Sequence, residues 1–244
     1  MEIIEGGVTA AEGFMASGCA AGIKKDGRAD MAMIFSKKPC VLAGTFTTNV
    51  VKAAPVIWDR QLTKDGKKAQ AIIVNSGVAN ACTGEKGLSY CRKTAEAASE
   101  ALGISADSVL VASTGVIGAQ IPIEKIVKGI SGLKDTLGDG IGDGTEAAKA
   151  IMTTDTVSKE AAVSILFSDG KNATLGGCCK GSGMIHPNMC TMLCFLTTDA
   201  CISKEMLQKA LSEVVPDTFN MVSVDGDTST NDTCLLLSNG LAGN

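Results

Sequence analysis

The chain has 244 residues, of which 45% are hydrophobic and 20% are charged, and its formal net charge is −4 at pH 7. This is enough apolar material to bury a full core in one large domain or two small ones, so we expect a globular protein. Nucleic acids and anionic membranes call for clustered Lys and Arg, and a membrane span needs roughly 18 consecutive apolar residues. The chain has neither, so we expect no nucleic-acid or membrane partner and favour a small molecule.

The ten cysteines would fit a secreted disulfide scaffold, but the chain opens on Met-Glu-Ile-Ile-Glu-Gly-Gly, without the basic and apolar segments of a signal peptide. We therefore expect reduced thiols and a cytoplasmic protein. The chain has no Cys-x-x-Cys pair and its single histidine is His186. A zinc site would need more of these ligands, so no metal is expected.

Short β-like runs alternate with turn signals in the first third of the chain and predict strands of a mixed sheet. They lie at residues 31–35, 41–46 and 55–58. A further apolar run, 71–74, enters the polar, glycine-containing loop 75–80. Apolar residues at spacings of three and four then predict a helix at 85–102, which Gly103 ends.

The same order of strand, loop and helix recurs in the middle of the chain. Strand 109–111 leads into loop 112–118, and Pro122 opens a helix, where its missing N–H costs nothing. A linker rich in Gly and Asp precedes a short helix that begins near Thr145, and residues 162–167 are the next predicted strand.

In the last third, Gly176-Gly177 and Gly181-Ser182-Gly183 bracket Lys180 ahead of the apolar run 192–196. A helix at 204–211, capped by Ser203, is followed by predicted strands at 219–224 and 234–237. The Asn239-Gly240 pair normally turns a strand into a partner strand, so the fold is either interrupted here or ends in a flexible tail. Together these elements predict an α/β fold with mixed sheets and flanking helices.

Two local patterns carry candidate chemistry. The acidic loop 225–232 follows an apolar run, as does the nucleophile loop of aspartate-dependent phosphohydrolases, with Asp225 and Asp227 as the candidates; turn chemistry alone favours a hydrogen-bonded turn. Thr191 opens an apolar run after a glycine-containing hinge at 180–183 and a Pro187-Asn188 turn. A Thr at the start of an apolar strand is usually only a good β-former, and the residues around Thr191 alone do not identify it as a nucleophile.

Many segments, in order along essentially the whole chain, together resemble one family, the ornithine acetyltransferases, also called glutamate N-acetyltransferases. The segments are Gly6-Gly-Val-Thr-Ala10, Ala16-Ser-Gly18, Ala21-Gly-Ile23, Thr47-Thr-Asn49, Val51-Lys-Ala-Ala-Pro55, Val74-Asn-Ser-Gly77, Ala79-Asn-Ala-Cys-Thr-Gly84, Ser113-Thr-Gly-Val-Ile-Gly118, Met152-Thr-Thr-Asp155, Lys180-Gly-Ser-Gly-Met-Ile185, Pro187-Asn-Met189, Thr191-Met-Leu193 and Val224-Asp-Gly-Asp-Thr-Ser-Thr-Asn-Asp-Thr233. Motifs of this length and order are far more specific than a lone glycine signature.

The resemblance implies a fold of the self-processing threonine N-terminal-nucleophile type. A precursor would cut itself between Cys190 and Thr191, giving an α chain of residues 1–190 and a β chain that starts at residue 191 and is present here as 191–244. A Thr hydroxyl is a poor nucleophile, but the freed α-amine, whose unperturbed pKa is about 7.7–8.0, can take its proton. Cleavage would therefore have to precede turnover.

The resemblance also implies the roles of individual residues. Thr114 and Gly115 match the oxyanion-hole pair, and Thr154, Lys180 and Thr191 match substrate-binding positions. The implied enzyme of arginine biosynthesis moves the acetyl group of N-acetylornithine to glutamate through an acetyl-threonine. It needs no cofactor, although some relatives take acetyl-coenzyme A as donor. The implied assembly is a cytoplasmic heterotetramer of two α and two β chains.

The chain departs from the family pattern at three places. Cys190 stands where Ala is usual, so a thiol adjoins the scissile bond, and Val78 replaces a typical Asn. Family members also continue well past Asn244 into a segment with a substrate-binding Glu and pocket-closing residues.

Three alternatives stay open at this point. A related threonine aminopeptidase or amidase would let water take the acyl group in place of glutamate. A phosphohydrolase on Asp225 and Asp227 would require magnesium. A fragment that binds ligands without catalysis would remain uncut.

Overall fold

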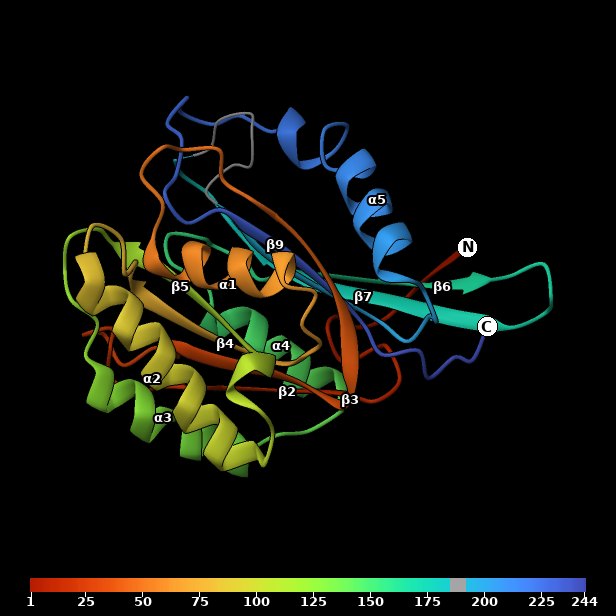
Figure 1. Ribbon diagram of the computed structural model, residues 1–244, viewed down its shortest axis with the longest axis horizontal. Helices are drawn as coiled ribbons and strands as arrows, with labels where there is room; N and C mark the ends of the chain where they lie inside the picture. The colour runs from red at the N-terminus through yellow and green to blue at the C-terminus, as the bar shows by residue number, and fades with distance from the viewer. Residues whose placement is uncertain (185–191) are drawn as a thin grey trace.

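The computed structural model describes residues 1–184 and 192–244, and it confirms an α/β fold with mixed sheets and flanking helices (Figure 1). The strands are β1 (Glu2–Ile4), β2 (Phe14–Cys19), β3 (Met31–Phe46), β4 (Ala69–Val78), β5 (Val109–Val116), β6 (Lys159–Leu166), β7 (Asn172–Lys180), β8 (Leu193–Thr198) and β9 (Thr233–Ser238). The α-helices are α1 (Ala54–Lys64), α2 (Gly84–Leu102), α3 (Ile123–Asp135), α4 (Ile141–Ala150) and α5 (Lys204–Val214), with 3₁₀ turns at Ala106–Ser108 and Phe219–Met221.

The long strand β3 belongs to two sheets. Its first part pairs with β2 and β4, and its last part, Val41 to Phe46, pairs with β9. The register with β4 shifts between Phe35 and Cys40, where Lys37, Lys38 and Pro39 are exposed. Pro cannot donate to a ladder and is tolerated at such a bulge. The bend therefore folds the sheet β1-β6-β7-β8-β9-β3 over the sheet β2-β3-β4-β5.

Successive side chains of each strand point to opposite faces of its sheet, so each sheet has one face toward the other sheet and one face toward helices. Ile34, Ile72 and Leu110 on one sheet share a buried cluster with Phe195 and Leu235 on the other. The intervening residues of each strand point outward. Those of the first sheet meet α2 and α3, and those of the second meet α5. The result is a sheet-on-sheet sandwich with helices outside it, while α4 closes one side of the inner core (Figure 1).

Two predicted strands are wrong. Residues 55–58 lie in α1, because Pro55 suits the first turn of a helix. Trp58 and Asp59 also hydrogen-bond the helix to β5. Trp58 Nε1 donates to the Val109 carbonyl at 3.0 Å, and the Val111 N–H donates to Asp59 Oδ1 at 3.0 Å. Residues 219–224 form a 3₁₀ turn and irregular chain, exposed from residue 221 onward.

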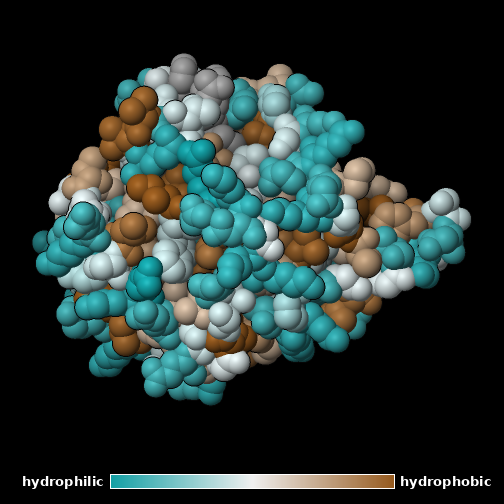
Figure 2. All heavy atoms as spheres, viewed as in Figure 1, coloured by the Kyte–Doolittle hydropathy of each residue, from teal (hydrophilic) through white to brown (hydrophobic). Residues whose placement is uncertain are grey.

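The remaining boundaries shift only slightly. The helix predicted near Thr145 starts at Ile141, and Ser203 caps α5 by accepting the Met206 N–H at 3.3 Å. After β9 the chain turns back, with the Asn239 N–H on the Thr198 carbonyl and the Ala242 N–H on the Asp199 carbonyl. Polar side chains cover most of the face shown in Figure 2, and apolar ones gather beside the β6–β7 hairpin. No helix in the described ranges is long and apolar enough to cross a membrane.

Candidate active site

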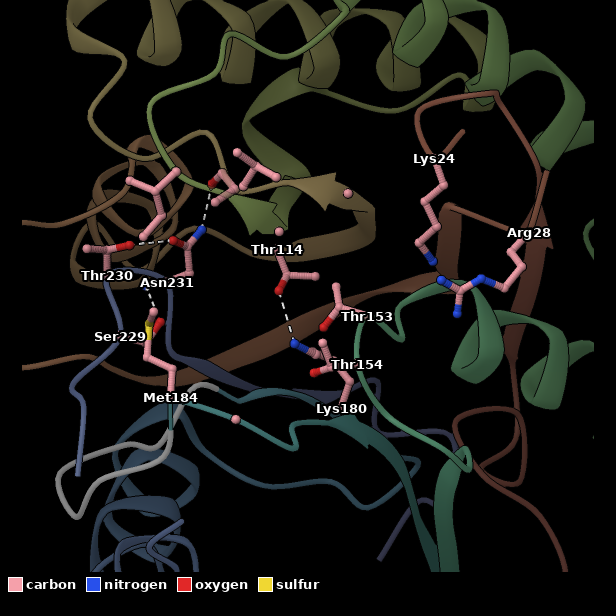
Figure 3. A pocket seen from close by; sticks show the side chains of 16 residues that line it. Lys24, Arg28, Thr114, Thr153, Thr154, Lys180, Met184, Ser229, Thr230 and Asn231 are labelled. Atoms are coloured by element: carbon pink, nitrogen blue, oxygen red, sulfur yellow. Dashed lines mark hydrogen bonds between the residues drawn. The ribbon is translucent and has the colours of Figure 1, made fainter. Parts of the chain in front are cut away.

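A cleft of about 490 Å³ opens at one end of the sandwich (Figure 3). Strand pairing brings five strand ends together there: β4, β5 and β7 finish at this end, and β8 and β9 begin at it. The loop before β3 and the segment between α4 and β6 complete the wall. Residues from these parts, other than β8, line the cleft, including Lys24, Arg28, Thr114, Gly115, Thr153, Thr154, Lys180, Thr230 and Asn231.

Thr114 and Lys180, assigned from separate motifs, are in direct contact. Lys180 Nζ donates to Thr114 Oγ1 at 3.1 Å, and the two side chains face one another in Figure 3. Both are buried, Thr114 with 4% and Lys180 with 3% of its surface exposed. Because the ammonium already donates to the hydroxyl oxygen, the hydroxyl proton is left to point elsewhere. Thr114 is thus set up as a hydrogen-bond donor with a cation behind it.

Gly115 occupies a position that only glycine can take. Its φ is +134°, and a Cβ placed on it would lie 2.3 Å from the carbonyl carbon of Gly77. The backbones of β4 and β5 therefore approach closely at the rim of the cleft. A side chain at residue 115 would push the two strands apart and displace Thr114.

Burial lowers the pKa of Lys180, while the negative charges of Asp155 and Asp232 act in the opposite direction. Asp155 holds the neighbouring backbone in place: Oδ1 accepts the Gly181 N–H and Lys159 Nζ, each at 2.7 Å, and Oδ2 accepts the Thr153 N–H at 3.1 Å. Burial raises the pKa of Asp155, but these hydrogen bonds outweigh it and leave the pKa below its usual range.

Thr154 lies next to Asp155 in the chain, on the exposed side of the cleft. Its hydroxyl is 2.6 Å from the hydroxyl of Ser182, one residue after Gly181. The two hydroxyls tie the segment between α4 and β6 to the end of β7. The role of Thr154 in substrate binding stays a prediction, but the residue does line the same cleft as Lys180.

Asn231 lines the cleft, and Asp232 lines a small void beside it; in the sequence both are only parts of a longer matching motif. Asn231 Nδ2 donates to the carbonyls of Ala79 and Ser113, at 2.7 and 2.8 Å, and so joins the chain before β9 to the ends of β4 and β5. Asp232 is fully buried, and its Oδ1 accepts the Met192 N–H at 3.1 Å. Burial raises the pKa of Asp232 to about 8.

The predicted nucleophile and scissile bond, Thr191 and Cys190, lie outside the described residues. The residue that follows them is described: Met192 shares a small internal void with Thr114, Lys180, Leu193, Asn231 and Asp232. Met192 therefore lies beside the buried contact between Lys180 and Thr114. That position agrees with the assignment of Thr191 but does not test it.

Val78, Asp225 and Asp227 are not among the described residues that line the cleft, although the end of the acidic loop, from Ser229 to Asn231, lines it. Val78 packs against the buried cluster of α2 and α3. Asp225 and Asp227 are exposed in a turn in which the Asp227 N–H donates to Asp225 Oδ1 at 3.2 Å. A phosphohydrolase nucleophile would need a strand ending at Asp225, and none is there. Within the described ranges no three His, Cys, Asp or Glu side chains form a metal-binding group.

A family model and the most similar curated proteins that we compared all point to the same protein family. The model of the ArgJ family matches residues 15–244. The arginine biosynthesis bifunctional protein ArgJ of Symbiobacterium thermophilum is 50% identical over 100% of this chain and 60% of its own length. The protein of the same name from Caldanaerobacter subterraneus is 51% identical over 100% of this chain and 59% of its own length. The chain thus spans about 60% of the length of these relatives.

Two solved structures share the fold. The ornithine acetyltransferase of Mycobacterium tuberculosis, crystallised in complex with ornithine, is 42% identical, covers 77% of this chain and 96% of its own, and has a TM-score of 0.69. The arginine biosynthesis bifunctional protein of Bacillus halodurans is 38% identical over 77% of this chain and 95% of its own, with a TM-score of 0.69.

Proposed function

This chain belongs to the ArgJ family, and on that premise we propose that it carries the nucleophile and oxyanion hole of an acetyltransferase that moves the acetyl group of N-acetylornithine to glutamate. The observation that carries the proposal is the contact of Lys180 with Thr114 at the cleft. Both residues also line a small internal void with Met192, the residue after the proposed nucleophile. Acetyl-coenzyme A is proposed as an alternative donor to glutamate.

The proposed precursor is cut between Cys190 and Thr191. Residues 1–190 become the α chain and residue 191 starts the β chain, in an assembly of two of each. The new α-amine of Thr191 takes the proton of its own hydroxyl, and the hydroxyl oxygen attacks the acetyl carbonyl of N-acetylornithine. Collapse of the tetrahedral intermediate releases ornithine and leaves acetyl-threonine. Glutamate then attacks the ester through its amino group and departs as N-acetylglutamate.

Thr114 and Gly115 are the proposed oxyanion hole for both tetrahedral intermediates. The support for Thr114 is that its hydroxyl accepts from Lys180 and keeps its own proton to donate to a developing oxyanion. The ammonium behind the hydroxyl adds favourable charge in a buried site, where electrostatic interactions are stronger than in water. Gly115 has a positive φ of +134°, and the absence of a side chain lets its backbone approach Gly77 beside Thr114.

The test of the function is transfer itself, measured with the complete gene product. Mixing N-acetylornithine and glutamate should yield ornithine and N-acetylglutamate in equal amounts, without added metal. Release of free acetate in place of N-acetylglutamate would instead identify a hydrolase of the amidase type. Neither product, with only uncut chains present, would support a non-catalytic fragment.

Lys180 is expected to matter to substrate use and not to self-cleavage, because cleavage involves no free amino acid. Its ammonium contacts Thr114, the proposed oxyanion-hole donor, and we propose that the α-carboxylate of either substrate binds there. Lys180→Met, which keeps the length of the buried side chain and removes the charge, should lower kcat/KM for both substrates by about 10²-fold while the chain is still cut. Equal kcat/KM values for the variant and the parent would refute the role; Lys171→Met, an exposed site, is the matched control.

A further inference from the structure

Lys24 lies in a loop that is built on a buried carboxylate. Asp30 Oδ1 accepts the Ala21 N–H at 2.7 Å, and its Oδ2 accepts the N–H groups of Ile23 and Lys24 at 2.5 and 2.9 Å. Gly77 permits the close approach of this loop, because a Cβ there would lie 3.2 Å from Ile23 and 3.4 Å from Lys24. The loop is thereby fixed against the end of β4, and Lys24 forms part of the cleft wall.

The ammonium of Lys24 is held in one place without a carboxylate partner. Its Nζ donates to the carbonyls of Ala29 at 2.8 Å and Met152 at 2.7 Å, which belong to the loop before β3 and to the segment between α4 and β6. It forms no ion pair with any carboxylate in the described residues. An ammonium has three N–H groups, so one remains for a ligand. A half-buried lysine fixed by two backbone carbonyls has already lost the side-chain freedom that binding would otherwise cost.

Two other cations border the same cleft. Burial lowers the pKa of Lys24, and the positive charges of Arg28 and, more weakly, Lys180 lower it further, whereas Asp30 and Asp26 oppose them. Asp26 is engaged by Arg28, whose Nε donates to it at 2.7 Å, and all of the contacts of Asp30 given above are to backbone N–H groups. Figure 3 shows Lys24 and Arg28 together on one wall, away from Thr230 and Asn231. Like charges gathered on one wall favour an anion between them.

We propose that Lys24, with Arg28 beside it, forms a second carboxylate subsite of the cleft, which holds the side-chain carboxylate of the acceptor glutamate. This subsite rests on the proposed function. The α-carboxylate is attached to the carbon that bears the acetylated nitrogen, so it lies close to the reacting carbonyl, where Lys180 contacts Thr114. The side-chain carboxylate lies two methylene groups further along, and Lys24 supplies a cation on the wall away from that contact.

The charges of this subsite act differently on the two substrates of the transfer. N-acetylornithine carries a terminal ammonium where glutamate carries its second carboxylate, and cations at Lys24 and Arg28 repel that ammonium. Once the acetyl group has moved to the enzyme, the same charges favour glutamate over the departing ornithine. Lys24 is therefore a specificity-determining residue for the acceptor, and it takes no part in bond making.

The test compares Lys24→Gln with Lys24→Arg in the complete, self-cleaved gene product. Gln keeps two N–H donors for the Ala29 and Met152 carbonyls and removes the charge, whereas Arg keeps the charge. In a two-step transfer, kcat/KM for each substrate reports its own half-reaction. Lys24→Gln should lower kcat/KM for glutamate about tenfold, the usual scale of one charge-assisted hydrogen bond. Lys24→Arg should restore most of the loss. In Lys24→Gln, kcat/KM for N-acetylornithine should not fall, because the lost charge repels the terminal ammonium of that substrate.

Glutamine as acceptor separates recognition of the carboxylate from a general loss of structure. The parent's preference for glutamate over glutamine should fall about tenfold in Lys24→Gln. The control is Lys125→Gln, which removes an exposed lysine that donates to the Gly22 carbonyl of the same loop, and it should leave the preference unchanged. Arg28→Gln, at an exposed position, should reduce the preference in the same direction.

An unaltered preference in both Lys24→Gln and Arg28→Gln would overturn the subsite, as would an equal loss of kcat/KM for glutamate and N-acetylornithine. Both results presuppose that the parent transfers acetyl groups. A parent that transfers none would contradict the proposed function itself, so the two failures are distinguishable.

Discussion

Thr191→Ala should leave the complete gene product as one uncut chain. The expected cleavage begins with attack of Thr191 Oγ1 on the carbonyl carbon of Cys190, which breaks the amide bond, frees the α-amine and forms an ester that water hydrolyses. Alanine has no hydroxyl, so neither the ester nor the new terminus can form. Denaturing gels and intact mass measure the result directly, and acetyl transfer should be lost with the cleavage.

Cys190 is the rival nucleophile, because a thiol is intrinsically more nucleophilic than a hydroxyl. Attack by Cys190 on the carbonyl of Met189 would put Cys190 at the new terminus, one residue before the expected one. We expect sequencing of the β chain to begin with Thr191, and Cys190→Ala to be cut normally. A cut Thr191→Ala protein would overturn the assignment.

Thr114→Val should lower kcat by about 10²–10³-fold, the usual loss on removing one oxyanion-hole donor. Valine is nearly isosteric and suits a β-strand, so β5 should keep its shape while the hydroxyl disappears. The change also removes the acceptor of the Lys180 hydrogen bond. Rates are to be measured per cut chain, so that a difference in the amount of cut chain is not counted as a change in kcat.

Thr114→Ser is the matched control, since it keeps the hydroxyl and loses only a methyl group. It should retain most of the activity of the parent. An unchanged kcat in Thr114→Val, with the usual amount of cut chain, would mean that Thr114 does not stabilise the intermediate.

The sequence predicted the fold class and most elements because their signals are local. The spacing in 85–102 and the Gly103 stop correspond to α2, and Gly103 adopts the left-handed conformation, with φ +68°. Residues 55–58 were misassigned because Pro55-Val-Ile-Trp58 has β-formers, whereas the fastening of Trp58 and Asp59 to β5 is a tertiary effect. Two apolar runs at 31–35 and 41–46 read as separate strands, since nothing local shows that one bent strand serves two sheets.

In the candidate site, too, the sequence revealed individual residues but not the tertiary contacts between them. Motif resemblance picked out Thr114 and Lys180, 66 positions apart, and the structure brings them into contact. It could not reveal that Asp155 clamps Gly181, or that Asn231 joins β9 to β5, because these roles depend on how strand ends meet in space. Lys24 stands in an ordinary polar loop, and only the carbonyls of Ala29 and Met152 distinguish it from a solvated charge.

The central claim is that Thr191 carries the acetyl group between the two substrates. The most direct measurement is the intact mass of the β chain after brief exposure to N-acetylornithine without glutamate, followed by peptide mapping. We expect a β chain heavier by one acetyl group on Thr191. This group should disappear when glutamate is added, while N-acetylglutamate appears. A β chain of unchanged mass during active transfer, or an acetyl group on another residue that glutamate removes, would contradict it.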